Sequence, residues 1–138
     1  MKKHLTALAM MVALLTSAAA YTQTVHLQTT VPFKFNVGSK QFPAGKYDIQ
    51  TESNREHVLY IRNMNSGEGA FVIPQSCESA DVSSQTTLTF HRYGQQYFIA
   101  EVWVAGYKQG YQFRVSRREA ELAKELSKQE STLLASRK

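Results

Sequence analysis

The chain has 138 residues, 43% of them hydrophobic, which is enough for one domain that buries a core without a metal or disulfide scaffold. Cys77 is the one cysteine, so a disulfide within the chain is excluded. The formal net charge is +5, and Lys2 and Lys3 contribute two of these charges. The remaining excess lies in residues 114–138, where seven basic and four acidic side chains are interspersed. Mixed charge of this kind is typical of a solvated face, so a nucleic-acid partner is not expected.

The N-terminal residues have the three parts of a secretory signal: two lysines, an apolar run over residues 5–15, and small residues ending at Ala20. The apolar run is shorter than the roughly 20 residues that span a bilayer, which argues against the alternative of a membrane anchor. Tyr21 stands where a lipoprotein would need a cysteine, so no covalent lipid is expected. We therefore predict that residues 1–20 are removed, which leaves a secreted protein of the periplasm or the exterior with no membrane span and no cofactor.

Alternation of apolar and polar residues between positions 31 and 115 predicts short antiparallel strands. One such run, "GKYDIQT", places Tyr47 and Ile49 on one face and Asp48 on the other. Two further runs, "HVLYIRN" and "GAFVIPQ", carry apolar side chains on both faces, as expected of strands that are covered on both sides. We therefore predict an all-β domain over residues 21–115, a small antiparallel barrel or sandwich of about six to eight strands.

The hydrophobic period changes after residue 115, and residues 116–138 predict one C-terminal α-helix followed by a frayed tail. Ser116 and Glu119 have the spacing of a capping box, in which each side chain accepts a hydrogen bond from the backbone N–H of the other residue. An apolar stripe on this helix is expected to pack on the sheet or to close the end of a barrel. The stripe consists of Leu122, Leu126 and Leu133.

Three segments in a fixed order carry a resemblance to a known group of proteins: "VPFKFNVGSKQFPAGKYDIQ", "LTFHRYGQQYFIAEVW" and "SRREAELAK". The chain resembles small secreted proteins abundant in Acidobacteria, and the resemblance covers most of residues 31–124. It implies a compact β-rich secreted domain, and it supplies no catalytic residues. One departure is Lys34, where relatives often have an acidic residue, so the resemblance gives no support to a cation site at this position.

The segment "TLTFHRYGQQYFIAEVW" (Thr87 to Trp103) predicts a β-hairpin. Gly94 and Gln95 suit the two central positions of a type II′ turn, in which the first residue has a positive φ. The resulting register places Arg92 opposite Tyr97. This is a cross-strand cation–π pair worth about 0.5–1 kcal/mol.

Strict alternation away from that turn predicts that Glu101 and Trp103 share a face with Phe90, so Trp103 is expected in the core. His91 then lies on the opposite face from Glu101. This argues against an acid–base pair between the two residues, since such a pair must lie within hydrogen-bonding distance. The candidate ligand-binding residues are Arg92, Tyr97, Glu101, Trp103 and His91.

The sequence contains no zinc-ligand spacing, no nucleophile elbow and no phosphate-binding loop. Two functions therefore remain. The first is a non-catalytic binding or interaction module whose partner is a small apolar ligand or a cell-envelope protein. The alternative is a small hydrolase or isomerase that uses His91, Arg92 or Glu101, and a pocket holding His91 beside a carboxylate would favour it. The aromatic residues expected to form the core, or to surround an apolar ligand, are Phe33, Phe35, Tyr47, Tyr60, Phe71, Phe90, Trp103 and Phe113.

Overall fold

The computed structural model describes residues 24–52 and 55–137, and the expected signal at residues 1–20 lies outside this part of the chain. The described residues form two sheets and one helix. The five-stranded sheet contains, in spatial order, β12 (Ser136–Arg137), β1 (His26–Val31), β4 (Gly45–Glu52), β5 (Arg55–Asn63) and β6 (Gly69–Val72). The seven-stranded sheet contains β11 (Gln129–Leu134), β8 (Thr87–Tyr93), β9 (Gln96–Trp103), β10 (Gln109–Gln112) and β7 (Gln75–Glu78), with β2 (Phe35–Val37) on β9 and β3 (Lys40–Phe42) on β2.

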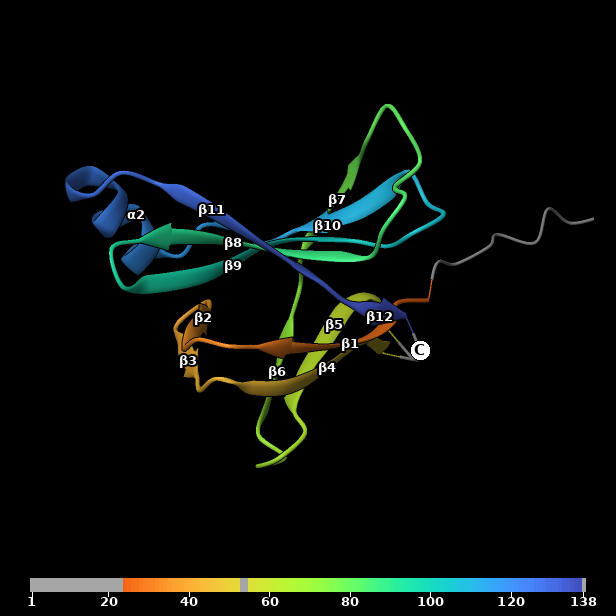
Figure 1. Ribbon diagram of the computed structural model, residues 1–138, viewed down its shortest axis with the longest axis horizontal. Helices are drawn as coiled ribbons and strands as arrows, with labels where there is room; N and C mark the ends of the chain where they lie inside the picture. The colour runs from red at the N-terminus through yellow and green to blue at the C-terminus, as the bar shows by residue number, and fades with distance from the viewer. Residues whose placement is uncertain (1–23, 53–54, 138) are drawn as a thin grey trace, which may run out of the picture.

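The two sheets form separate layers with the core between them (Figure 1). Inward-facing side chains of both sheets supply that core: Tyr47 and Ile49 come from the five-stranded sheet, and Phe90 and Val102 come from the seven-stranded sheet. The predicted all-β class with one helix is therefore confirmed. Within the described residues both sheets are open, so the barrel form is not seen. These residues also contain more strands than the six to eight expected, because several of them are only two to four residues long.

The C-terminal residues join the two layers. In place of the expected frayed tail, β11 pairs with β8 and β12 pairs with β1. Thr29 Oγ1 donates to the Leu134 carbonyl at 3.3 Å, and the Ala135 N–H donates to the Thr86 carbonyl at 2.9 Å. Leu133, which the sequence predicts on a helical stripe, lies instead on β11 and packs against the core. A short mixed sequence such as "QESTLL" becomes a strand because β8 offers it an edge, not because of its own pattern.

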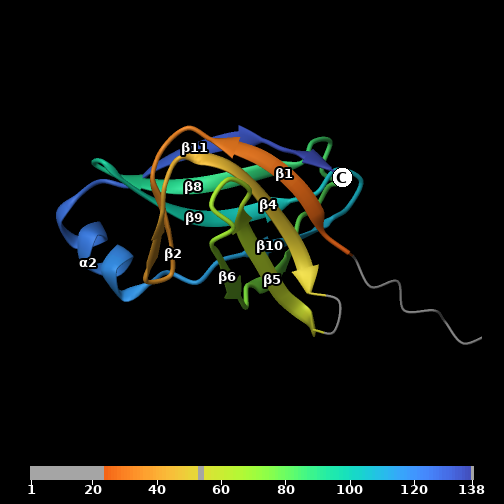
Figure 2. The ribbon, with the colours of Figure 1, turned by 90° about the horizontal axis from the view of Figure 1, so that it is seen from below.

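The helix α2 (Arg117–Glu125) begins where the sequence predicts and is shorter than expected. Ser116 is the N-cap, and its hydroxyl accepts a hydrogen bond from the Glu119 N–H at 3.1 Å. The helix ends at Leu126, the C-cap residue. It lies beside the end of the β8–β9 hairpin, near β2 (Figure 2).

The register of the β8–β9 hairpin follows the prediction next to the turn and departs from it further away. The pairs from Tyr93 with Gln96 to Phe90 with Ile99 are confirmed. A β-bulge then shifts the register, so that Thr89 lies opposite Glu101 and not opposite Ala100. Because one extra residue reverses the side of every later side chain, Glu101 and Trp103 lie on the face opposite Phe90. Their assignment to the core face is therefore wrong.

The predicted type II′ turn requires a positive φ at its first central residue only. Gly94 has a φ of +60°, and Gln95 has no positive φ, so both residues meet this requirement. We expect Gly94→Val to lower the free energy of unfolding by about 1 kcal/mol or more, because a β-branched side chain is strained at positive φ. A Cβ at this position would also lie 3.4 Å from Leu126 Cδ1. Thermal melts of Gly94→Val and of Gln95→Val, a control at the next exposed position, test this. Equal melting temperatures for wild type and Gly94→Val would contradict it.

Three of the aromatic residues assigned to the core lie elsewhere. Phe71 is 63% exposed on β6, and Tyr60 stacks on it with the ring centroids 4.6 Å apart. Trp103 is half-buried. The prediction that β5 and β6 are covered on both faces is therefore wrong, since an apolar run cannot by itself distinguish a covered sheet face from an exposed aromatic pair.

Candidate functional site

The five residues predicted as ligand-binding are not brought to one place. Arg92 and Tyr97 form the predicted pair near the hairpin turn, with the guanidinium carbon 5.5 Å from the ring centroid. Arg92 Nε also donates to the Gly94 carbonyl at 2.8 Å, and Tyr97 stacks on Phe33 with the centroids 3.8 Å apart. These contacts occupy both side chains in holding the turn against the edge of the core.

Glu101 and Trp103 form a second group on the outer face of the seven-stranded sheet. Trp103 Nε1 donates to Glu101 Oε2 at 2.9 Å, and the indole lies over Gly110, where a Cβ would come within 2.6 Å of the ring. Cys77 is opposite Gly110 on β7. Burial, and secondarily the charge of Glu101, raise the pKa of the Cys77 thiol. The thiol therefore stays protonated and is a poor nucleophile.

His91 belongs to a third group, whose centre the sequence did not reveal. His91 Nδ1 lies 2.9 Å from Glu119 Oε1, and the Tyr93 hydroxyl donates to the same oxygen at 3.2 Å. Since a carboxylate oxygen accepts, the imidazole donates from Nδ1. On its other side, His91 Nε2 faces the exposed Glu130 carboxylate at 3.9 Å.

Glu119 is 3% exposed, although every other residue of α2 is at least partly exposed. The capping-box spacing identified this residue but assigned its side chain to the Ser116 N–H. The carboxylate instead reaches across to β8, where it finds two donors, so only the Ser116 half of the capping box is confirmed. A glutamate in the first turn also suits the positive end of the helix dipole. Glu119 thus fastens α2 to the sheet by hydrogen bonds more than by apolar packing.

The raised pKa of Tyr93 predicts that the stability of the fold decreases at alkaline pH. Burial, then the charge of Glu119 and its hydrogen bond, raise the pKa of Tyr93 above its ordinary value of 10.0. The folded state therefore holds this proton after the unfolded chain has lost it. The resulting stability is fully present below pH 10.0 and is lost as the pH rises through the higher pKa of the folded state.

We expect urea unfolding midpoints to fall as the pH rises above about 10, and to fall less steeply in Tyr93→Phe. The slope against pH is the measure, because loss of the hydroxyl lowers stability at every pH. The fall persists in part, since burial also raises the pKa values of Tyr47 and Tyr111. An equal slope in wild type and Tyr93→Phe would contradict the assignment.

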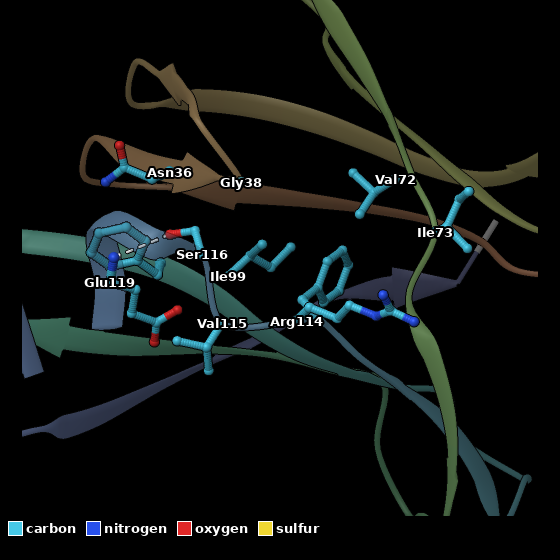
Figure 3. Close-up of a pocket in the computed structure, with 11 residues that line it drawn as sticks. Asn36, Gly38, Val72, Ile73, Ile99, Arg114, Val115, Ser116 and Glu119 are labelled. Atoms are coloured by element: carbon cyan, nitrogen blue, oxygen red, sulfur yellow. Dashed lines mark hydrogen bonds between the residues drawn. The ribbon is translucent and has the colours of Figure 1, made fainter. Parts of the chain in front are cut away.

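A pocket of about 220 Å³ lies at the start of α2 (Figure 3). The Glu119 carboxylate is directed away from Asn36 and Gly38 in this view, toward the side of Val115, consistent with its hydrogen bonds to β8. The walls of the pocket come from four parts of the chain, and most of the lining surface is apolar. The lining residues are Asn36, Gly38, Val72, Ile73, Phe98, Ile99, Phe113, Arg114, Val115, Ser116 and Glu119.

Two of the apolar residues at this pocket are largely exposed, Ile73 at 68% and Val115 at 58%. In the sequence both belong to segments that leave a strand, "VIPQ" and "FRVS", and neither segment has a motif. The sequence therefore does not predict the pocket, because the pocket forms where the chain crosses between sheets. His91 is not among the lining residues, so it lies beside a carboxylate but not in this pocket.

The comparisons with known proteins add no relative: no family model, no curated protein and no solved structure matches the chain. Within residues 24–52 and 55–137, no group of three or more histidine, cysteine, aspartate or glutamate side chains is placed to hold a metal ion. In the part of the chain that the structure describes, no helix is long and apolar enough to cross a membrane.

Proposed function

We propose that this protein is a secreted, non-catalytic binding module, built as a β-sandwich, that holds a small apolar group in the pocket at the start of α2. The observation that carries the proposal is the exposure of Ile73 and Val115 beside a concave, mostly apolar surface. A ligand that covers exposed apolar side chains lowers the free energy of binding by about 25 cal/mol for each Å² of apolar surface removed from water.

The size of the pocket limits what it can bind. Sites for drug-sized ligands enclose about 300–1,000 Å³, and an engineered cavity of about 150 Å³ holds one benzene molecule. A pocket of about 220 Å³ therefore suits a single ring or a short branched chain. A long acyl chain would have to extend into solvent.

The pocket can be tested with toluene, monitored by the methyl resonances of Val72, Ile73 and Ile99. We expect these signals to shift in saturable fashion, and the shifts to be absent in Val115→Trp, whose larger side chain narrows the pocket. Val82→Trp is the control, since Val82 is an exposed valine that does not line it. Absence of any shift in the wild-type protein, or equal shifts in Val115→Trp, would refute the proposal.

A second candidate function rests on the 2.9 Å contact between His91 and Glu119, which resembles the base and orienting carboxylate of a hydrolase. No described serine, threonine or cysteine side chain is hydrogen-bonded to His91, so this arrangement has no nucleophile to activate. A hydrolase or isomerase would have to use His91 as a base toward a bound substrate. Hydrolysis of p-nitrophenyl acetate that is lost in His91→Gln, while circular dichroism shows that the variant is folded, would favour this function over binding.

The secreted location is tested separately. We expect protein recovered from the periplasm or the medium to have the mass of a chain that begins at Tyr21, because the small residues before it suit signal peptidase. Intact-mass spectrometry is the measurement. A membrane-bound species that still carries residues 1–20 would contradict it.

A further inference from the structure

The outer face of the five-stranded sheet carries two rows of side chains that the pocket does not use. Tyr47 and Ile49 point into the core, so their neighbours on β4 point outward. The register sets four outward residues side by side across the strands in each row. One row is His26, Gln50, Tyr60 and Phe71, and the next row is Gln28, Asp48, Arg62 and Gly69.

An aromatic pair forms one end of this face. Tyr60 lies over Gly69, where even a Cβ would come within 2.6 Å of its hydroxyl oxygen. Phe71 stacks on Tyr60 at an interplanar angle of 29° and remains 63% exposed. Because Gly69 has no side chain, the Tyr60 ring can pack directly against the backbone of the sheet. The aromatic pair offers an apolar area for the C–H groups of a flat, otherwise polar molecule.

Hydrogen-bonding groups fill the rest of the face. Asp48 accepts hydrogen bonds from His26 Nε2 at 3.0 Å and Gln28 Nε2 at 3.4 Å. These contacts fix the orientation of both donor side chains. Beyond them lies a mainly polar hollow of about 380 Å³, whose lining includes Gln28, Thr30 and Lys46. The face thus combines an aromatic area with amide and hydroxyl groups, whereas the Asp48 carboxylate is buried, with its side chain 6% exposed.

Two basic side chains lie on this face: Arg62 in the second row, and Lys46 in the row beyond it, opposite Thr30. Lys46 and Arg62 are exposed, and within the described part of the chain neither has a carboxylate within 4.0 Å. They flank Asp48, Lys46 two residues before it on β4 and Arg62 opposite it on β5. Asp48 is occupied by His26 and Gln28. Two cations are therefore free to pair with the carboxylates of a ligand.

We propose that this face binds an acidic polysaccharide, a sugar chain that carries carboxylates. One sugar ring lies on Phe71, hydroxyl groups hydrogen-bond to Gln50 and Gln28, and carboxylates pair with Arg62 and Lys46. The four strands span about 14 Å, which gives room for a short stretch of such a chain. A polymer fits this flat surface better than a compact ligand, which would bury little of itself on it. The proposal is independent of the pocket, since Phe71, Arg62 and Lys46 do not line it.

Isothermal titration with polygalacturonate tests the proposal, with neutral dextran as the uncharged comparison. We expect binding to polygalacturonate, weak or no binding to dextran, and a weaker affinity as NaCl is raised from about 50 to about 500 mM. Phe71→Ala and Arg62→Gln should each lower the affinity about fivefold or more. The matched control is Lys108→Gln, which removes one exposed positive charge outside this face and should change the affinity less than twofold.

Four results would overturn the proposal. The first is no binding of polygalacturonate to the wild-type protein, and the second is equal binding of dextran. The third is an equal loss of affinity in Lys108→Gln and Arg62→Gln, which would indicate attraction by net charge alone. The fourth is dimerisation in sedimentation velocity that Phe71→Ala abolishes, since a second copy of the chain would then occupy the face. Shifts caused by toluene in the pocket are expected to be the same in Phe71→Ala, so the two proposals can fail separately.

Discussion

Phe35→Ala is expected to lower the free energy of unfolding by about 4 kcal/mol, because it removes a buried ring and leaves a cavity. Phe35 is 1% exposed and contacts three other rings: Phe42, Tyr47 and Phe90, with centroids 5.6, 4.9 and 5.3 Å away. Tyr47 belongs to the five-stranded sheet and Phe90 to the seven-stranded sheet, so Phe35 joins the two layers. The loss is a large share of the roughly 5–15 kcal/mol that stabilises a domain.

Urea unfolding of the protein measures this effect through the midpoint at constant slope. Phe71→Ala is the matched control, since the same substitution at an exposed phenylalanine should cost less than about 1 kcal/mol. A cost below about 1 kcal/mol for Phe35→Ala would contradict the placement of this ring at the centre of the core. The control also shows whether Phe71→Ala is folded, as the polysaccharide experiment requires.

Glu119→Ala is expected to lower the free energy of unfolding by about 3 kcal/mol, because the buried Tyr93 hydroxyl and the partly buried His91 imidazole lose their acceptor. His91 Nδ1 and the Tyr93 hydroxyl both bond to Glu119 Oε1, and the glutamate side chain is 4% exposed. Loss of the carboxylate also frees α2 from the sheet. We therefore expect faster hydrogen exchange of the helix amides in this variant, beyond the change in global stability.

Two further variants make the test specific. Glu119→Gln keeps an acceptor oxygen at the same place, so it should recover part of the stability. Glu121→Ala on the same helix should cost less than about 0.5 kcal/mol, because its pair with Arg117 joins two exposed side chains. If Glu121→Ala and Glu119→Ala have equal costs, the buried carboxylate does not anchor the helix.

Features that depend on local pattern can be predicted from the sequence alone. Alternation along "GKYDIQT" correctly predicted that Tyr47 and Ile49 face the core, since the pleat sends alternate side chains to opposite sides. Gly94 has the positive φ predicted from its place in the turn, and Ser116 caps the helix where the period changes. Each of these features is decided by a few consecutive residues, whose own steric and hydrogen-bonding preferences favour one conformation.

The remaining features depend on which residues the fold places opposite one another, so they follow from the tertiary structure. A β-bulge moved Trp103 to the outer face, and an available strand edge drew "QESTLL" into the sheet. Glu119 bonds to β8 instead of to its own helix because burial beside the His91 and Tyr93 donors gives it two partners that the sequence separates by 28 and 26 residues. The pocket and the outer face of the five-stranded sheet likewise gather residues from distant strands. Long-range pairing of this kind leaves no periodic trace in one chain, so only the folded arrangement of the strands reveals it.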